Sequence, residues 1–337
     1  MKKISMFILI VVIILVTGCS NKKVELEEPI PEDKIIKDIE RDIWVVQDDD
    51  KLVVGYRYNE KENIWIEFAK RGINELLQIS NVFTTAIQDK MTKNEFDNLD
   101  KVQLIDSYTD WISPCMFRKG SQKTEDEPQF TGGWHGVDDK YETARMLDYN
   151  IEVDGNVNSN IVQVASEVVL TVTNNLYAYN TIDSKKEELQ ETVIYNINSD
   201  GIQVEVELKA LDDIVIEKYY GLQTLNSLYR GSLIYDGAED TAFDPFKGSE
   251  SPPKSNDCSY QVTLRSEDGA HVLIASINKD VGLGKGDYLG DSIPYAFTLS
   301  YGKTYFDLVR GKELHLKKGE TAKWKGRYIF KYEDINN

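Results

Sequence analysis

The sequence predicts an all-β protein built as one large antiparallel β-sandwich. Two observations support this fold class. Short runs of β-branched and aromatic residues recur with turn residues between them, and several runs alternate strictly between apolar and polar side chains. No internal repeat of the solenoid or propeller kind is present. We expect a single domain over residues 44–335, a size that all-β sandwiches do reach.

Residues 1–18 have the layout of a secretory signal. Lys2 and Lys3 precede an apolar run over residues 6–16, which is too short to span a bilayer core that needs about 20 residues. The run ends in residues 16–19, Val-Thr-Gly-Cys, which resemble the lipobox of bacterial lipoproteins. The resemblance implies cleavage before Cys19 and attachment of a diacylglycerol to its sulfur, with acyl chains such as palmitate in the membrane. An ordinary secretory signal is the alternative.

The composition excludes some partners. The formal net charge is −18, which argues against nucleic acid because phosphate binding needs clustered Lys and Arg. It argues more mildly against polyanionic substrates. Besides Cys19 the chain has only Cys115 and Cys258, which could form a disulfide or remain two separate thiols. Two such widely spaced cysteines make a poor metal site.

The first third begins with a tether and continues into a strand meander. Residues 19–43 are charged and contain two prolines, so we expect a flexible tether with a short helix in which Ile35, Ile36, Ile39 and Ile43 recur at helical spacing. Aromatic and β-branched runs then predict three strands at 44–46, 52–58 and 64–68. Residues 72–87 have mixed spacing, and a short helix is plausible there.

The middle of the chain predicts long antiparallel strands. Apolar residues occupy even positions from 162 to 172, as one face of a single long strand requires. Residues 193–197 and 202–210 alternate in the same way, and a Ser-Asp-Gly turn at 199–201 joins them as a hairpin.

The final third repeats this pattern around long loops. Strands are expected at 260–264, 272–277, 296–301, 305–309, 313–316 and 323–332. The glycine-containing loops at 118–145 and 280–294 are long for a compact β domain, and such loops are usually functional or disordered.

The first candidate site lies in the glycine-rich residues 130–136. Gly132 and Gly133 allow close backbone approach or positive φ angles next to Trp134 and His135. An indole can stack on a sugar ring, and an imidazole can bind a hydroxyl group or move a proton. These residue types therefore indicate carbohydrate binding. The alternative is a turn whose Trp folds back onto the core.

A second candidate site lies in residues 218–223. Tyr219, Tyr220 and Gln223 supply phenols and an amide that suit hydroxyl recognition, and Tyr220 could carry a proton. Aromatic residues that simply close a strand end are the alternative. Arg145 could pair with a carboxylate bidentately, although an ordinary surface salt bridge is the other interpretation.

Other sites lack support in the sequence. There is no P-loop, no dinucleotide fingerprint, no Gly-x-Ser-x-Gly elbow and no zinc-protease helix. Residues 154–158 resemble a calcium loop only superficially, because Ser159 replaces the required Gly and Ala165 replaces the closing Glu. His271 and His315 are expected to have no functional role. We therefore expect no cofactor and no metal site.

Four short segments resemble those of carbohydrate-active β-supersandwich proteins, which include galactose-mutarotase-like and polysaccharide-lyase domains. The segments are residues 130–136, 220–223, 303–306 and 324–328. The resemblance would cover residues 44–332 and implies a broad groove that receives a sugar chain. In its lyase version, His135 or Tyr220 would take the proton and Arg145 would neutralise the carboxylate of a uronate.

These observations lead to one functional expectation and one alternative. We expect a lipid-anchored protein on the extracytoplasmic face of the cell membrane that binds a carbohydrate or cell-wall glycan through Gly132, Gly133, Trp134, Tyr219 and Gln223. Action on a polysaccharide, as a lyase or in a mutarotase-like way, would use His135, Tyr220 and Arg145. The alternative is a non-catalytic envelope lipoprotein that binds another protein.

Overall fold

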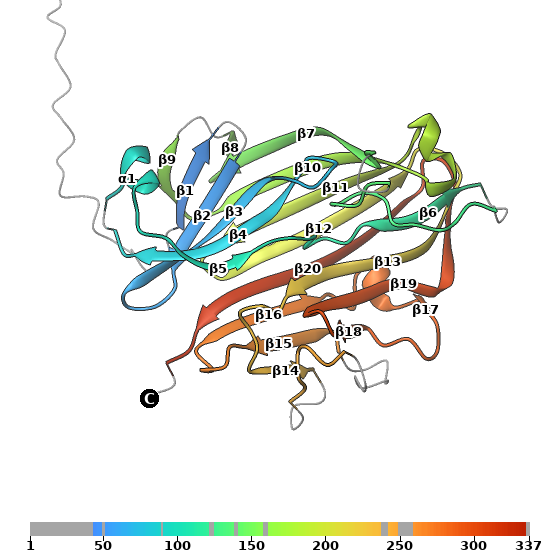
Figure 1. Ribbon diagram of the computed structural model, residues 1–337. Helices are drawn as coiled ribbons and strands as arrows, with labels where there is room; N and C mark the ends of the chain where they lie inside the picture. The colour runs from blue at the N-terminus through green and yellow to red at the C-terminus, as the bar shows by residue number, and fades with distance from the viewer. Residues whose placement is uncertain are drawn as a thin grey trace, which may run out of the picture. The chain divides into compact units, whose positions relative to one another are not determined.

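The computed structural model describes residues 43–48, 51–88, 90–120, 125–137, 141–157, 161–236, 242–248 and 259–334 (Figure 1). All of them belong to one compact unit, residues 38–337. The unit consists almost entirely of antiparallel strands, which confirms the all-β prediction. The predicted signal peptide, Cys19, the tether with all of its predicted helix except Ile43, and Cys258 lie outside the described residues.

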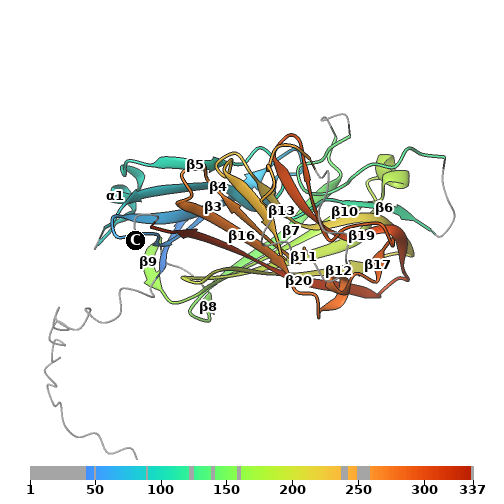
Figure 2. The same cartoon turned by 90° about the horizontal axis from the view of Figure 1, so that it is seen from below.

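A nine-stranded sheet forms one layer (Figure 2). Strands β11 (Glu187–Asn198) and β12 (Gly201–Ala210) lie near its middle and make the predicted hairpin, with Asn198 opposite Gly201 at the turn. In order across the sheet, its strands are β14 (Ser232–Tyr235), β15 (Gln261–Arg265), β16 (His271–Ile277), β20 (Thr321–Tyr332), β12 (Gly201–Ala210), β11 (Glu187–Asn198), β10 (Val168–Tyr177), β7 (Ala144–Val153) and β8 (Asn156–Val157).

A six-stranded sheet contains the predicted meander. Its order is β5 (Val102–Asp106), β4 (Leu76–Ala86), β3 (Glu62–Arg71), β2 (Lys51–Arg57), β1 (Ile43–Asp48) and β9 (Val162–Ala165). The helix considered for residues 72–87 is wrong, because most of this segment forms β4. Nearly every residue of β4 is buried, since core clusters lie on both faces of the sheet. A strand covered on both faces loses the alternation that identifies strands in a sequence.

The long strand expected from residue 162 to residue 172 is also two strands. β9 pairs with β1 of the six-stranded sheet, whereas β10 pairs with β7 and β11 of the nine-stranded sheet. The chain leaves one sheet for the other at Ser166 and Glu167, whose backbone N–H groups both donate to Oδ1 of Asp154. This side-chain acceptor replaces the ladder bonds that a continuous strand would make there.

A five-stranded sheet completes the second layer. Its path is β17 (Tyr288–Leu289), β19 (Lys303–Leu316), β13 (Ile214–Leu225) and β6 (Cys115–Lys119), and β18 (Ala296–Leu299) also pairs with β19. The separate strands expected at 305–309 and 313–316 are a single strand that passes through Gly311.

Both smaller sheets pack on the same face of the nine-stranded sheet. Phe68 of β3 meets Tyr195 of β11 edge to face, with ring centroids 5.0 Å apart. In the five-stranded sheet, the Tyr219 hydroxyl accepts a hydrogen bond from Nε1 of Trp324 in β20 at 3.1 Å. One hydrophobic cluster runs through all three sheets. The core therefore lies between two layers, as a sandwich requires.

Helical structure is brief and local among the described residues. α1 (Lys93–Asp97) begins at Thr92, which forms a capping box with Glu95, and it places Phe96 in a small core on the outer side of the six-stranded sheet. The remaining helical turns are the 3₁₀ segments η2 (Tyr179–Ser184) and η3 (Gly282–Lys285).

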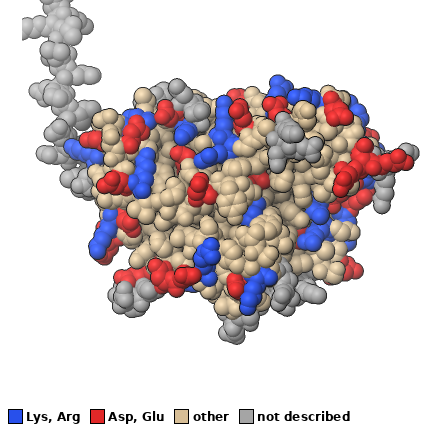
Figure 3. All heavy atoms as spheres, in the orientation of Figure 1, with Lys and Arg blue, Asp and Glu red and all other residues tan. Residues whose placement is uncertain are grey.

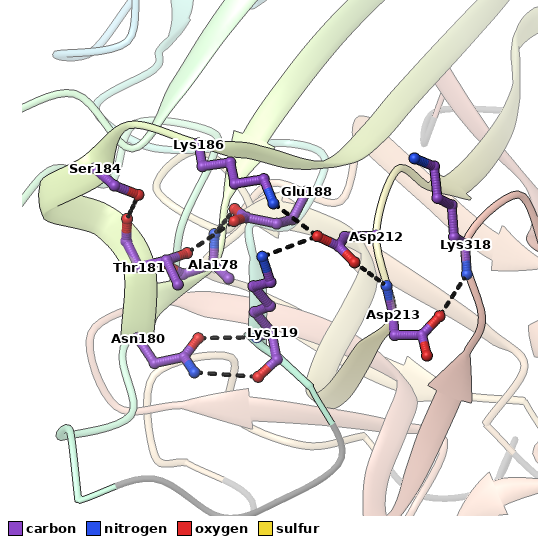
Figure 4. Close-up of polar contacts among 10 residues, drawn as sticks. All are labelled: Lys119, Ala178, Asn180, Thr181, Ser184, Lys186, Glu188, Asp212, Asp213 and Lys318. Atoms are coloured by element: carbon purple, nitrogen blue, oxygen red, sulfur yellow. Dashed lines mark hydrogen bonds and ion pairs between the residues drawn. The ribbon is translucent and has the colours of Figure 1, made fainter.

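A polar cluster fastens η2 to the neighbouring strand ends (Figure 4). The carboxylate of Asp212 binds the ammonium groups of Lys119 and Lys186 at 2.9 and 2.7 Å. Asn180 exchanges two hydrogen bonds with the backbone of Lys119. The buried Glu188 carboxylate accepts from Ala178 N and Thr181 Oγ1. A cavity of about 750 Å³ lies beside η2, between residues 126–129 and 179–184.

Candidate functional site

One face of β13, β18 and β19 gathers several chemically useful side chains. Tyr220 lies opposite Asp307, and Gln223 lies opposite Tyr305. Phe297 of β18 lies opposite Tyr305 on the other side of β19. Because residues directly opposite each other in an antiparallel pair project to the same face, these five side chains share one side of the sheet.

Bulges make this grouping possible. Three steps along β13 from Tyr220 to Gln223 match only two steps along β19, from Asp307 to Tyr305. The extra β13 residue puts two side chains three positions apart on the same face. A second register shift leaves Leu308 as an extra residue in β19. It brings Arg310 beside Asp307, with 3.2 Å between Nη1 and Oδ2.

The glycine-rich loop is fixed next to this face. Thr131 exchanges two backbone hydrogen bonds of 2.9 Å with Cys115 of β6. Gly132 and Gly133 adopt φ angles of +84° and +51°, in the left-handed region that favours glycine. Nδ2 of Asn74 donates to the carbonyl oxygens of Gly133 and His135, at 2.9 Å each. The turn is therefore held from both sides.

The loop brings His135 to a buried carboxylate. Nε2 of His135 lies 3.5 Å from Oδ2 of Asp110, and Oδ1 of Asp110 accepts the backbone N–H of Trp134 at 2.6 Å. Burial raises the pKa of Asp110, while the nearby His135 and Lys303 act in the opposite direction. A Cβ atom on Gly133 would collide with the Asp110 carboxylate, so the contact requires glycine there.

Aromatic rings connect the loop to the sheet. The Phe130 ring lies 5.8 Å from the imidazole of His135 and 5.5 Å from the ring of Tyr220. Tyr220 in turn lies 5.4 Å from Phe297 and 5.1 Å from Tyr305, centroid to centroid. The structure thus links His135 and Tyr220 through Phe130.

Charged groups complete the arrangement. Nζ of Lys303 donates to Oγ1 of Thr109 at 2.8 Å and lies 4.9 Å from the Tyr305 ring centroid. Burial lowers the pKa of Lys303 to about 8. Burial raises the pKa of Asp307 to about 7, against the opposing effect of Arg310. Both groups can therefore change charge near neutral pH. We call this set the β13/β19 cluster: Asp110, Phe130, His135, Tyr220, Gln223, Phe297, Lys303, Tyr305, Asp307 and Arg310.

Several buried polar atoms in the β13/β19 cluster have no hydrogen-bond partner among the described residues. They are Oδ2 of Asp110, Oδ1 of Asp307, and both Oε1 and Nε2 of Gln223. Unpaired buried polar atoms are uncommon and cost about 1–3 kcal/mol each. Four such atoms are therefore gathered in the β13/β19 cluster.

The other predicted residues of the two segments lie deeper. The Tyr219 side chain is fully buried in the core against Trp324. A Cβ atom on Gly132 would contact the Leu176 side chain, so this glycine packs against β10. The backbone of Gln223 is fixed by Tyr328, whose hydroxyl donates to the Gln223 carbonyl at 2.7 Å.

Trp134 and Arg145 make their described contacts elsewhere. Trp134 is half-buried and packs against the turn at Gly72. A Cβ atom added to Gly72 would collide with the backbone and side chain of Trp134. Arg145 is a largely exposed residue of β7, and its guanidinium binds the carboxylate of Glu187 through Nε at 3.0 Å and through Nη2. The guanidinium in the β13/β19 cluster is that of Arg310.

Reasoning from the sequence missed most of the charged groups in the cluster. Asp110 lies in a short polar segment with no motif. Lys303, Tyr305 and Asp307 alternate along one strand, a signal that could have placed them on one face. Arg310 carried no such signal because the bulge at Leu308 interrupts the alternation.

Charge is distributed unevenly over the surface drawn in Figure 3. Acidic side chains lie mainly toward the edges of that face, and its centre is largely uncharged. Within the described ranges, no group of three or more His, Cys, Asp or Glu side chains is placed so that it could hold a metal ion. Cys115 is buried and free. None of the described helices has the length and apolar character needed to cross a membrane.

Comparisons with known proteins find similarity only among solved structures. No protein-family model and no curated protein matches the chain. An α-galactosidase from Lactobacillus brevis matches with a TM-score of 0.45 and 9% identity over 86% of this chain and 41% of its own. A GH36 α-galactosidase from Geobacillus stearothermophilus matches with a TM-score of 0.44 and 11% identity over 84% of this chain and 41% of its own.

A smaller protein matches over nearly its whole length. A galactose mutarotase-like protein from Clostridium acetobutylicum has a TM-score of 0.39 and 8% identity, over 87% of this chain and 99% of its own. The chain therefore spans about two fifths of the α-galactosidases and almost all of the mutarotase-like protein.

Proposed function

We propose that the chain is a membrane-anchored, extracytoplasmic protein that binds a carbohydrate at the β13/β19 cluster. The observation that supports this most strongly is the set of unpaired buried polar atoms on Asp110, Gln223 and Asp307, placed among aromatic rings. A sugar has hydroxyl groups that both donate and accept hydrogen bonds, and C–H faces that pack on aromatic rings. A carbohydrate would satisfy both features at once.

The cluster offers complementary donors and acceptors. Oδ1 of Asp307 and Oδ2 of Asp110, which also lies 3.5 Å from Nε2 of His135, are buried acceptors that sugar hydroxyl groups would reach once the side chains covering them move aside. Gln223 can donate through Nε2 and accept through Oε1. Burial raises the pKa of Tyr220 to about 12, so its hydroxyl keeps its proton and acts as a donor. Each charged contact with a hydroxyl group contributes about 1.5–3 kcal/mol.

Proton transfer to or from a bound glycan would depend on groups other than those expected from the sequence. With a raised pKa, Tyr220 is a poor base at neutral pH, whereas the pKa of Asp307, about 7, suits proton exchange. Arg145 is engaged with Glu187, and Arg310 is the guanidinium near Tyr220. Turnover of a polysaccharide, as a lyase or in a mutarotase-like way, would therefore use Asp307, together with His135 and Asp110.

Glycan retention tests the proposal. The full chain, purified in detergent, is run through gels that contain individual polysaccharides, and product mass spectrometry follows incubation with each one. We expect retardation by at least one polysaccharide, and its loss in Tyr220→Ala. Tyr141→Ala, an exposed tyrosine outside the cluster, serves as the matched control. Unsaturated products would identify a lyase, and unchanged products would identify a binding protein. No retardation across a broad panel would favour an envelope protein that binds another protein.

The anchoring part of the proposal rests on the N-terminal sequence. Lys2, Lys3 and the apolar run at residues 6–16 precede Cys19 in the order of a lipoprotein signal. Mass spectrometry of the N-terminal peptide from membrane fractions should show a chain that begins at Cys19 and carries acyl groups. Cys19→Ser should release the chain from the membrane fraction. An unmodified peptide cut at another position would identify an ordinary secretory signal.

A further inference from the structure

Two exposed large hydrophobic side chains among the described residues lie beside the β13/β19 cluster. Tyr301 is 55% exposed and Tyr108 is 56% exposed. Tyr301 belongs to the turn between β18 and β19, and Tyr108 belongs to the segment between β5 and Asp110. They come from distant parts of the chain and reach the same side of the site.

Contacts join both tyrosines to the cluster. The Tyr301 hydroxyl hydrogen-bonds to the Tyr305 hydroxyl at 2.7 Å, and Tyr305 packs on Tyr220. Thr109, directly after Tyr108, accepts a hydrogen bond from Lys303. Partial burial and the nearby Tyr301 phenol both raise the pKa of Tyr108. Tyrosines therefore follow one another from the half-buried Tyr220 through Tyr305 to the exposed Tyr301, and Tyr108 lies near Tyr301.

The backbone that carries Tyr301 is held firmly. The N–H of Gly302 donates to the Leu299 carbonyl, and the Gly302 carbonyl accepts from Asn226 N, both at 2.9 Å. Gly302 has a φ of +81°, and the ring of Phe246 occupies the space that a side chain there would need. The turn is thus fixed, although the ring of Tyr301 remains exposed.

The backbone that carries Tyr108 is fixed in a similar way. Ser107 N donates to the Ser80 carbonyl of β4 at 3.0 Å, and Oγ of Ser107 accepts from Nε1 of the buried Trp111 at 2.7 Å. Exposed rings on a fixed backbone lose little conformational entropy when a ligand packs on them. Both tyrosines have this property.

We propose that Tyr301 and Tyr108 form a stacking platform for sugar units outside the β13/β19 cluster, so that the ligand is a glycan chain of three or more units. This inference rests on the proposed function, which places one unit at the cluster. Each exposed ring offers an apolar face that a further pyranose ring can cover. The Tyr108 hydroxyl can hydrogen-bond to the rim of such a unit, whereas the Tyr301 hydroxyl already bonds to that of Tyr305.

Dependence of affinity on chain length tests the platform. The full chain in detergent is titrated calorimetrically with saccharides of one to six units in four series, built from glucose, galactose, N-acetylglucosamine and galacturonate. In the series that binds, we expect affinity to rise at least about tenfold between one and three units, which corresponds to about 1.4 kcal/mol. Tyr301→Ala and Tyr108→Ala should each remove most of this gain and leave binding of the single sugar unchanged.

Two controls separate the platform from indirect effects. Tyr301→Phe keeps the ring and should retain most of the gain with chain length. Tyr141→Ala removes a tyrosine of matched exposure, 61%, and should leave the gain intact. Two results would overturn the platform and leave the binding proposal standing. One is a saccharide series that binds with the same affinity at every chain length, and the other is a rise in affinity with chain length that persists in both alanine variants. Failure of all four series to bind would overturn the binding proposal, and the platform with it.

Discussion

The Asp110 carboxylate lies 3.5 Å from Nε2 of His135 and also accepts the backbone N–H of Trp134. One buried acid therefore positions both the imidazole and the turn that carries it. The arrangement depends on Gly133, whose missing side chain leaves the space that the carboxylate fills.

Gly133→Ala should disrupt this arrangement. The new methyl group would collide with Asp110 in addition to straining a backbone with a φ of +51°. We expect a loss of about 1–3 kcal/mol in the free energy of unfolding, together with loss of glycan retention. Gly155→Ala is the matched control because it adds the same strain at a φ of +76° with no atom within 4 Å. Equal effects of the two substitutions in urea denaturation would show that Asp110 does not need this space.

Glycan affinity should depend on pH in a bell-shaped way. Asp307, with a pKa of about 7, becomes a better acceptor as it ionises, so affinity should rise with pH through 7. Lys303, with a pKa of about 8, loses its charge above that pH, so affinity should fall again. Asp307→Asn should remove the acidic limb and Lys303→Met the alkaline limb in calorimetric titrations from pH 5 to 9. A flat profile for the unsubstituted protein would contradict the assignment of both groups to the site.

Glu191 should make stability depend on pH. It is buried beside Asn174, and burial raises its pKa from 4.5 to about 7. Because its pKa is higher in the folded protein than in the unfolded chain, the contribution of Glu191 to stability is fully present below pH 4.5. That contribution is lost as pH rises through about 7. The loss amounts to about 3 kcal/mol at 1.36 kcal/mol per pKa unit.

Glu191→Gln should therefore lose less stability than the unsubstituted protein between pH 4.5 and pH 8. Urea denaturation at both pH values measures the difference. Glu205→Gln, on a half-exposed surface residue that pairs with Lys325, is the control and should follow the unsubstituted protein. If Glu191→Gln loses as much stability as the unsubstituted protein over this pH range, the Glu191 carboxyl group is solvated in the folded state.

Trp134→Ala should mainly reduce stability. The indole packs against the Gly72 turn and is half-buried, so we expect a loss of about 2 kcal/mol, below the range for a fully buried Trp. Trp134→Phe should lose clearly less. Urea denaturation and glycan retention are measured on the same samples. Unchanged stability with lost retention would instead place the indole ring against the glycan.

Local sequence patterns predicted those elements in which one face of a strand is buried and the other is solvated. β11 from Leu189 onward and β12 from Ile202 onward alternate between buried and more exposed side chains and are joined by a two-residue turn, and both features are readable over a few residues. The patterns failed where this condition does not hold. β4 is covered on both faces, and the break between β9 and β10 depends on the side chain of Asp154.

The candidate site could be predicted only in part for a related reason. The glycine-rich loop and Tyr220 stood out because glycine and indole, imidazole or phenol groups, which suit ligand binding, lie within a few residues of one another in each segment. Asp110, Lys303 and Arg310 did not stand out, because each has an ordinary local context. Their relation to one another depends on which strands pair and in which register.

The sequence by itself determined the all-β class, the main hairpin and the glycine turn that carries His135, since these depend on interactions between residues close in the chain. Only the tertiary structure decided that Tyr220 faces Asp307 and that Arg310 joins them. These contacts arise from pairing between β13 and β19, and from bulges that shift the alternation by one residue. A one-residue shift reverses which face every later side chain occupies, and local sequence carries little information about it.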